Sequence, residues 1–337
     1  ALKGAKNVIV HFYNSTSTLQ RKVVFKEGQE GIIKIAVDGA KLIRELSEQE
    51  TARSGMNIRY EYSPESFTGT EIDFSIEICE KVMEALGASE ERKVILNLPS
   101  TVEMATPNTY ADQIEYFCTH MKNRESAIIS LHPHNDRGTG VAATELGLMA
   151  GADRVEGTLF GNGERTGNVD IVTLALNMYT QNVNPMLNFS NINEIKEVCE
   201  QCTKMNIHER HPYAGELVFT AFSGSHQDAI RKGFEYMVKS QTPYWEVPYL
   251  PINPADLNRE YEPVIRINSQ SGKGGAAFVL QQTVGYELPK NMHPEFGDIV
   301  KAAADASGEE LNPTQIVDLF NKEYIAFVGK YKLLKHR

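Results

Sequence analysis

Residues 127–150, AIISLHPHNDRGTGVAATELGLMA, decide the fold class because they hold a complete strand, loop and helix pattern. The apolar run 127–132 has the length of a buried strand, and residues 140–150 have the spacing of a helix. Four more short apolar runs repeat the arrangement, each followed by a loop and a helical pattern. The five predicted strands are residues 7–13, 58–63, 94–99, 127–132 and 155–160.

Helical patterns separate all of these strands. Near-continuous apolar strands that alternate with amphipathic helices are typical of a parallel sheet covered by helices, so the predicted fold class is α/β. A (βα)₈ barrel takes about 250 residues, so this length favours one large domain with a smaller tail. We expect helices at residues 29–46, 71–86, 110–121, 140–150 and 169–179, and later at 192–205, 226–238, 293–306 and 313–324.

The composition excludes several classes of function. The chain is 41% hydrophobic and has a formal charge of −10, with acidic and basic residues mixed along its length. It has no basic run suited to a phosphate backbone, so no nucleic-acid partner is expected. It also lacks an apolar stretch of about 18 residues and a signal pattern, so we expect a cytoplasmic protein without a membrane partner.

Four cysteines, Cys79, Cys118, Cys199 and Cys202, fit a reducing compartment. Cys199 and Cys202 have the C-x-x-C spacing of a zinc or redox site. They fall in a helical pattern with no second pair nearby, so we interpret them as ordinary helix residues.

His132 and His134 stand where the strand 127–132 gives way to a loop. Residues two apart on a strand point to the same face, so both imidazoles should lie at the carboxyl end of the parallel sheet, where such proteins build active sites. Two histidines can hold a divalent ion if further ligands complete the site. The alternative is that both cap the strand and bond to neighbouring loops. The two histidines are followed directly by Asn135 and Asp136, and this pattern favours a metal-binding site.

The loop FGNGERTGN, residues 160–168, follows the next predicted strand. Its three glycines allow a tight turn. Its position after the strand that follows the two histidines makes it a candidate for another ligand, although a glycine-rich turn with solvated charges is the alternative. The later loop SQSGKGG, residues 269–275, lacks the pattern of a Walker loop. The polar side chains of the first loop are Asn162, Glu164, Arg165 and Asn168.

Together the two motifs resemble the family of Claisen-condensing acyltransferases that includes the 2-isopropylmalate, homocitrate and citramalate synthases and is related to hydroxymethylglutaryl-CoA lyase. Further segments make the chain similar to the 2-isopropylmalate synthases in particular, in the form found in fungi and actinobacteria. The resemblance runs over nearly the whole chain. The segments are HFYNSTS (11–17), EYSPES (61–66), NLPSTVEMATPN (97–108), RHPYAG (210–215), FSGSHQD (222–228) and WEVPYLP (245–251).

The resemblance implies a (βα)₈ TIM-barrel enzyme that condenses acetyl-CoA with 2-oxoisovalerate to give 2-isopropylmalate, the first committed step of leucine biosynthesis. It implies a divalent metal (Zn, Mg or Mn), acetyl-CoA as co-substrate and a monovalent cation as activator. The metal ligands would be His132, His134 and Asn168. The keto-acid pocket would contain His11, Ser63, Thr101 and Gly167.

The same resemblance gives catalytic roles to Glu65, His226 and Tyr249. The reaction needs a base for the methyl proton of acetyl-CoA and a group that holds the enolate oxygen. Glu65 and His226 are both candidates for the base, and the sequence does not choose between them. From the residues alone, Glu65 is equally a helix-start carboxylate, His226 a packed residue at a helix N-terminus, and Tyr249 a surface residue between prolines.

In the family, the segment that holds His226 and Tyr249 reaches into the site of a second subunit, so a homodimer is implied. The pair His208 and His211 has a spacing of three and is followed by Pro212, which stops a helix. These two histidines are therefore assigned a structural or substrate-positioning role.

The chain departs from the family pattern at both ends. The family barrel has eight strands, and its first ends in an Arg-Asp pair that completes the metal site and stabilises the oxyanion. Five strands and no such pair are found here, so the missing part is expected before Ala1. We expect an open barrel with uncovered Val8, Val10 and Phe12, and a polypeptide that is inactive or weakly active alone.

The expected division is a partial TIM barrel of about five βα units followed by a mostly helical C-terminal subdomain. Two rival functions are a homocitrate or citramalate synthase with another keto acid, and a non-catalytic fragment that binds a metal or a partner subunit. The predicted boundaries are 1–185 for the barrel, 186–240 for its closing helices, 241–325 for a linker and small helical subdomain, and 326–337 for the stub of a leucine-binding regulatory domain.

Overall fold

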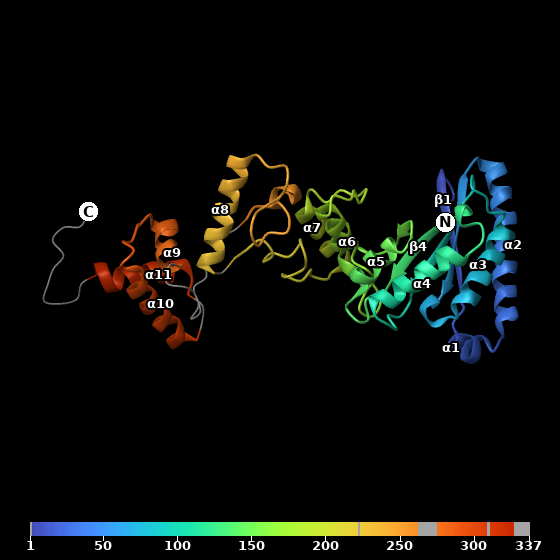
Figure 1. Ribbon diagram of the computed structural model, residues 1–337, viewed down its shortest axis with the longest axis horizontal. Coiled ribbons are helices and arrows are strands. Elements are labelled where there is room, and N and C mark those ends of the chain that lie inside the picture. Colours follow the sequence, from blue (N-terminus) through green and yellow to red (C-terminus); the bar gives the residue numbers. More distant parts are fainter. Residues whose placement is uncertain (1, 222, 262–274, 309–310, 327–337) are drawn as a thin grey trace. The chain divides into compact units, whose positions relative to one another are not determined.

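A computed structural model describes residues 2–221, 223–261, 275–308 and 311–326. The chain divides into two units, Ala1–Leu187 and Asn188–Arg337. The first unit holds all five strands of the sheet, and the second is helical with extended connections (Figure 1). Residues 269–274 of the predicted loop 269–275, and residues 327–337 of the predicted stub 326–337, lie outside the described residues.

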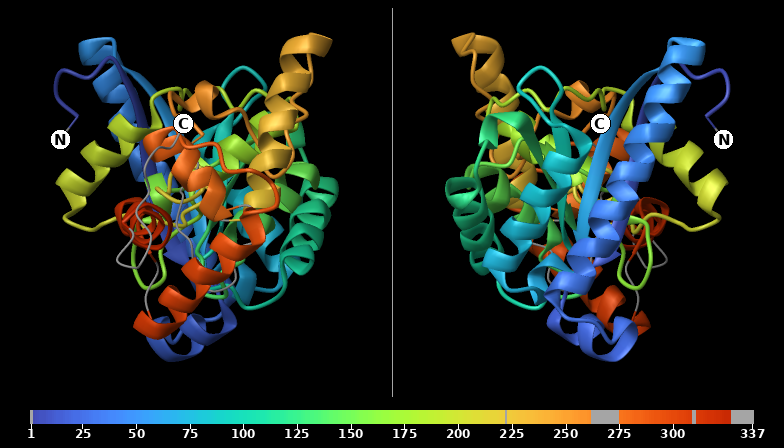
Figure 2. Two further views of the ribbon diagram at one scale, coloured as in Figure 1. Left: turned by 90° about the vertical axis from the view of Figure 1, so that its left-hand side faces the viewer. Right: turned by 90° about the vertical axis from the view of Figure 1, so that its right-hand side faces the viewer.

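The sheet of the first unit is parallel, with its strands in chain order. Neighbouring crossover helices pack on one another in the order α2, α3, α4 and α5, which makes a layer beside the sheet (Figures 1 and 2). This confirms the α/β fold class with five βα units. The strands are β1 (Asn7–Ser15), β2 (Asn57–Glu65), β3 (Val94–Ser100), β4 (Ala127–Pro133) and β5 (Arg154–Val155). The helices are α1 (Thr18–Gln20), α2 (Gln29–Ser54), α3 (Ile72–Leu86), α4 (Pro107–His120), α5 (Gly140–Met149) and α6 (Ile171–Thr180).

The two faces of the sheet differ in chemistry because side chains alternate along each strand. The residues on the helix side form one hydrophobic core with the buried faces of the helices. The residues on the opposite face include the polar side chains of the candidate site. The core contributions of the strands are Val8, Val10 and Phe12 of β1, Ile58, Tyr60 and Tyr62 of β2, Val94, Leu96 and Leu98 of β3, and Ala127, Ile129 and Leu131 of β4.

The prediction that Val8, Val10 and Phe12 lack cover is wrong. All three pack against the hydrophobic core, and it is Ile9 and Tyr13 that are exposed, at 46% and 66%. The reason is the period of two along the strand: the side chains that alternate with Val8, Val10 and Phe12 share the face of the candidate site.

The predicted fifth strand, residues 155–160, is also wrong in extent. The strand β5 is only Arg154–Val155, and a 3₁₀ turn follows at Leu159–Gly161. Beyond Val155 the chain folds back on residues 168–170, where Thr158 pairs with Asp170. This close approach requires Gly157, because a Cβ there would lie 2.5 Å from the carbonyl oxygen of Val169.

The second unit is built from helices. A hydrophobic cluster joins α9, α10 and α11 around Phe296, Val300 and Ile316. Separately, α8 packs on the extended segment that holds Trp245, whose ring lies 5.8 Å from that of Phe234. No helix in the described ranges is both long and apolar enough to cross a bilayer. The helices are α7 (Ile192–Thr203), α8 (Gly224–Ser240), α9 (Gly275–Val284), α10 (His293–Ser307) and α11 (Pro313–Phe320).

Candidate active site

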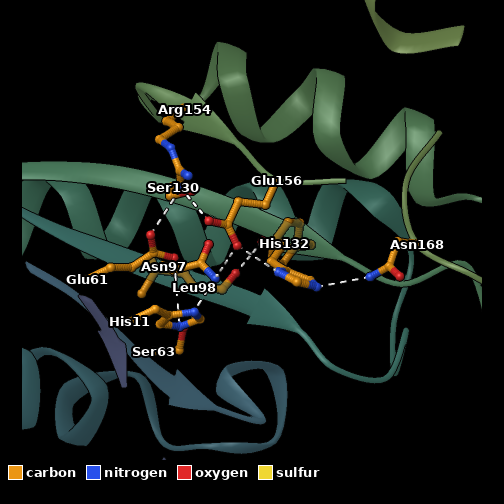
Figure 3. A network of polar contacts seen from close by, with 11 residues as sticks. His11, Glu61, Ser63, Asn97, Leu98, Ser130, His132, Arg154, Glu156 and Asn168 are labelled. Carbon is orange, nitrogen blue, oxygen red and sulfur yellow. Dashed lines mark hydrogen bonds and ion pairs between the residues drawn. The ribbon is translucent and has the colours of Figure 1, made fainter. Parts of the chain in front are cut away.

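Polar side chains gather on the face of the sheet opposite the helices, toward the carboxyl ends of the strands (Figure 3). Strand register explains why they meet: His11 pairs with Glu61, and Asn97 pairs with Ser130, so their side chains lie on one face. Because parallel strands all end at the same edge, all five strands and the loop after β5 contribute to a single site.

A continuous chain of hydrogen bonds crosses this face (Figure 3). It joins β1, β2, β3, the residues after β5, β4 and finally the glycine-rich loop. The links are His11 Nε2 to Ser63 Oγ at 2.7 Å, Asn97 Nδ2 to Ser63 Oγ at 3.1 Å, Asn97 Nδ2 to Glu156 Oε2 at 3.1 Å, His132 Nδ1 to Glu156 Oε2 at 3.0 Å, and Asn168 Nδ2 to His132 Nε2 at 2.9 Å.

Glu156, a member of this chain, also contacts Arg154, and Arg154 in turn lies close to a second carboxyl group, that of Glu61. Arg154 Nη1 lies 2.6 Å from Glu156 Oε1 and 3.6 Å from Glu61 Oε2. Burial, followed by a hydrogen bond with Glu156, raises the pKa of Glu61 to about 8. Burial acts in the same direction on Glu156, but hydrogen bonds with His132 and Arg154 outweigh it and hold the pKa of Glu156 below its usual value. The pair therefore divides into a protonated Glu61 and an ionised Glu156 at neutral pH.

The two histidines of β4 lie together. The ring centroids of His132 and His134 are 5.6 Å apart, and Asn168 contacts His132. Nδ1 of His134 is buried and has no hydrogen-bond partner among the described residues. Partial burial and the nearby Arg165 lower the pKa of His134, which keeps the imidazole neutral, the form that binds metal.

This donor set fits a divalent cation, although it is not complete by itself. Two neutral imidazoles with a carboxamide beside them suit several divalent ions. The unpaired Nδ1 of His134 is a buried acceptor that a cation would satisfy. No group of three or more His, Cys, Asp or Glu side chains with metal-binding geometry is found within the described ranges, so these residues alone supply two imidazoles and one amide.

The loop 160–168 is tied to the rest of the rim by Arg165. Its Nε donates to Asp136 Oδ1 at 2.8 Å, and its Nη2 donates to the carbonyl of Thr101. The hydroxyl oxygen of Thr101 accepts a hydrogen bond from the backbone of Ser66 at 2.9 Å. The loops after β2, β3, β4 and β5 therefore form one connected rim.

Two glycines of this loop are required by close contacts. A Cβ on Gly163, whose φ is +158°, would lie 2.2 Å from Asn168 Oδ1. A Cβ on Gly167, whose φ is +92°, would lie 1.8 Å from the carbonyl oxygen of Gly161. The carbonyl of Gly167 in turn accepts from the backbone N–H of Asn135. The glycines thus set the position of Asn168 against His132.

The other predicted residues fall into two groups. Glu65, the last residue of β2, lies at the same strand end and accepts a hydrogen bond from Ser15 at 2.7 Å. His226 and Tyr249 belong to the second unit, where their rings stack with centroids 4.2 Å apart. Both rings are exposed, and Tyr249 has a left-handed backbone conformation with φ of 66°. The stacking brings these two residues together, and their roles stay predictions.

The middle of the network is formed by residues that the sequence motifs did not predict to be site residues: Glu61, Asn97, Arg154 and Glu156. A signal was present: Glu61 lies between Tyr60 and Tyr62, and Asn97 lies between two leucines. A charged or amide side chain within a buried apolar strand needs a polar partner. That rule identifies the positions, although it does not identify the partners.

These features define an α/β protein whose site lies at the carboxyl ends of parallel strands, with two histidines suited to metal. The HMGL-like family model matches residues 1–199, which is more than half of the chain. The chain belongs to the HMGL-like family. A second model, described as alpha-isopropylmalate synthase, post-catalytic domain-like, matches residues 216–281.

Close relatives cover the whole chain. A 2-isopropylmalate synthase of Clostridium acetobutylicum is 59% identical over 337 residues, and one of Mesorhizobium japonicum is 60% identical over the same length. This chain spans about 60% of the length of each of these curated relatives. Among solved structures, a hydroxymethylglutaryl-CoA lyase from Pseudomonas aeruginosa aligns with 62% of this chain and 66% of its own, at 14% identity and a TM-score of 0.48.

Proposed function

We propose that this chain carries the catalytic region of an enzyme that condenses acetyl-CoA with 2-oxoisovalerate to give 2-isopropylmalate, the first committed step of leucine biosynthesis. The observation that carries the proposal is 59–60% identity, across the full 337 residues, to proteins named 2-isopropylmalate synthase. The polar network at the strand ends supports it, because carbon–carbon condensation needs positioned acids, bases and a polarised carbonyl.

His132, His134 and Asn168 would hold a divalent cation, Zn, Mg or Mn. When bound, such a cation supplies the Lewis acidity that polarises the carbonyl of an α-keto acid. The neutral state of His134 and its unpaired buried Nδ1 support this assignment. A monovalent cation activator belongs to the proposal as well.

The keto acid would lie against His11, Ser63, Thr101 and Gly167. Ser63 Oγ accepts from Asn97 Nδ2 and lies 2.7 Å from His11 Nε2, so these side chains present a fixed polar array to a carboxylate or carbonyl. Partial burial lowers the pKa of His11, so that residue is neutral at pH 7. Thr101 is held from both sides by Ser66 and Arg165.

Either Glu65 or His226 would remove a proton from the acetyl methyl group, and Tyr249 would assist in its stacked position beside His226. The methyl carbon then bonds to the keto carbon, whose oxygen takes up a proton, and water hydrolyses the thioester to release CoA. The stacked pair belongs to the second unit. In line with the family resemblance, we propose that the enzyme is a cytoplasmic homodimer in which this segment reaches into the site of the other subunit.

Calorimetry of keto-acid binding tests the proposal. The chain should bind 2-oxoisovalerate only in the presence of Mg²⁺, Mn²⁺ or Zn²⁺, and more tightly than pyruvate or 2-oxoglutarate. His132→Ala and His134→Ala should each abolish the metal-dependent binding of 2-oxoisovalerate. Tighter binding of 2-oxoglutarate or pyruvate would support a homocitrate or citramalate synthase instead. If the chain binds none of the three keto acids, the non-catalytic fragment is the function that remains.

A further inference from the structure

Glu156 lies between His132, a predicted metal ligand, and the half-buried Arg154, and the proposed function gives it no role. We propose that Glu156 is a positioning residue, whose carboxylate accepts a hydrogen bond from His132 Nδ1–H and so fixes the ring orientation and the tautomer that offer Nε2 to a divalent cation. The inference rests on the proposed function, because it concerns the same metal site.

The two nitrogens of His132 contact different partners. Nδ1 lies 3.0 Å from Glu156 Oε2, and Nε2 lies 2.9 Å from Asn168 Nδ2 (Figure 3). An ionised carboxylate only accepts hydrogen bonds and an amide nitrogen only donates them. Nδ1 therefore carries the hydrogen and Nε2 carries the lone pair. This is the tautomer in which Nε2 can bind a metal.

Glu156 is itself held at both oxygens. Arg154 Nη1 contacts Oε1 at 2.6 Å, and Asn97 Nδ2 donates to Oε2 at 3.1 Å. Arg154 also donates to Ser130 Oγ at 2.9 Å, which fixes the guanidinium. A carboxylate held in this way cannot rotate away from His132. Its negative charge is balanced by Arg154.

The opposite tautomer of His132 would be unfavourable on both sides. Its Nδ1 lone pair would face the Glu156 carboxylate, and its Nε2–H would face the amide hydrogens of Asn168. The position of the carboxylate thus decides which nitrogen is available. Such a carboxylate behind a metal-binding histidine typically changes metal affinity by about 10- to 100-fold.

The test measures Co²⁺ binding by the visible absorption of the bound ion, using the full chain. Glu156→Gln keeps the shape of the side chain but removes the charge, and its amide can turn a donor toward Nδ1. We expect Glu156→Gln to bind Co²⁺ about 10- to 100-fold more weakly than the parent chain. Glu156→Asp keeps the charge but withdraws it by one methylene, so its affinity should fall between those of the parent and Glu156→Gln.

The matched control is Asp153→Asn. Asp153 is three residues away, accepts from Arg124 at 2.7 Å and from the backbone of Ile129 at 2.8 Å, and has no hydrogen bond or ion pair with His132 within the described ranges. It should lose stability without losing Co²⁺ affinity. His132→Ala defines the background binding by histidines elsewhere in the chain.

A second readout needs no metal. Long-range ¹H–¹⁵N correlation spectra distinguish the two imidazole tautomers, and His132→Ala assigns the signal. The parent chain should show Nδ1–H at His132, and Glu156→Gln should lose that preference. Parent-like Co²⁺ affinity in Glu156→Gln, or an Nε2–H tautomer in the parent, would overturn the inference. A parent chain that binds no Co²⁺ but shows the Nδ1–H tautomer would refute the metal site of the proposed function instead.

Discussion

Replacing Glu61 by glutamine should make the first unit more stable at neutral and alkaline pH. The side chain of Glu61 is only 2% exposed, and its Oε1 has no hydrogen-bond partner within the described part of the chain. Burial and the neighbouring Glu156 raise the pKa of Glu61 to about 8, against an ordinary value of 4.5. A glutamine has nearly the same shape as the protonated acid and carries no ionisable proton.

The direction of the effect follows from proton uptake. Between pH 4.5 and about 8 the folded chain keeps the Glu61 proton that the unfolded chain has released, so the free energy of unfolding falls as the pH rises. One proton corresponds to about 1.4 kcal/mol per pH unit. From pH 5.5 to pH 7.5, the parent should therefore lose about 3 kcal/mol relative to Glu61→Gln.

Urea unfolding at both pH values measures this difference, because all other groups are shared by the two proteins. The only tryptophan, Trp245, belongs to the second unit, so its fluorescence reports on that unit and far-UV circular dichroism is needed for the first. Ser63→Ala removes a neutral member of the same network and should keep the parent's pH dependence. Parallel pH profiles of the parent and Glu61→Gln would show that Glu61 is ionised in the folded chain.

Two further substitutions separate the site from the core. Gly163→Ala should weaken Co²⁺ binding several-fold, because its Cβ would lie 2.2 Å from Asn168 Oδ1. The control is Gly138→Ala, which also has a positive φ but has no described atom within 4 Å of its Cβ, and it should bind Co²⁺ like the parent. Tyr62→Phe removes the hydroxyl that donates to Asn14 Oδ1 at 2.9 Å in the core. It should lower the free energy of unfolding in urea by about 1–2 kcal/mol and leave Co²⁺ affinity unchanged; a stability equal to the parent would contradict this account.

The sequence predicted the first four strands well. Residues 7–13 correspond to β1 (Asn7–Ser15), and residues 94–99 to β3 (Val94–Ser100). These strands could be predicted because a strand buried beneath helices needs apolar residues at every second position. The predicted start of α11 is confirmed for a local reason: Asn312 caps the helix and Pro313 occupies its first turn.

The sequence could not show which face of each strand carries the site. A period of two is the same whichever face is buried, and in β1 the exposed face was assigned to the wrong set of residues. The network around Glu156 was missed for a related reason. Glu156 lies 59 residues from Asn97 and 24 residues from His132 along the chain, and only strand register brings the three together.

The same register couples the predicted metal ligands to the predicted keto-acid pocket. No hydrogen bond joins Ser63 to His132 directly in the described part of the chain, but Asn97 donates to both Ser63 and Glu156, and Glu156 accepts from His132. Two intervening side chains, Asn97 and Glu156, therefore connect the predicted pocket to the predicted metal ligand by hydrogen bonds. Since each strand alternates one residue in this network with one in the core, the site and the fold depend on the same register, and a shift by one residue would destroy both.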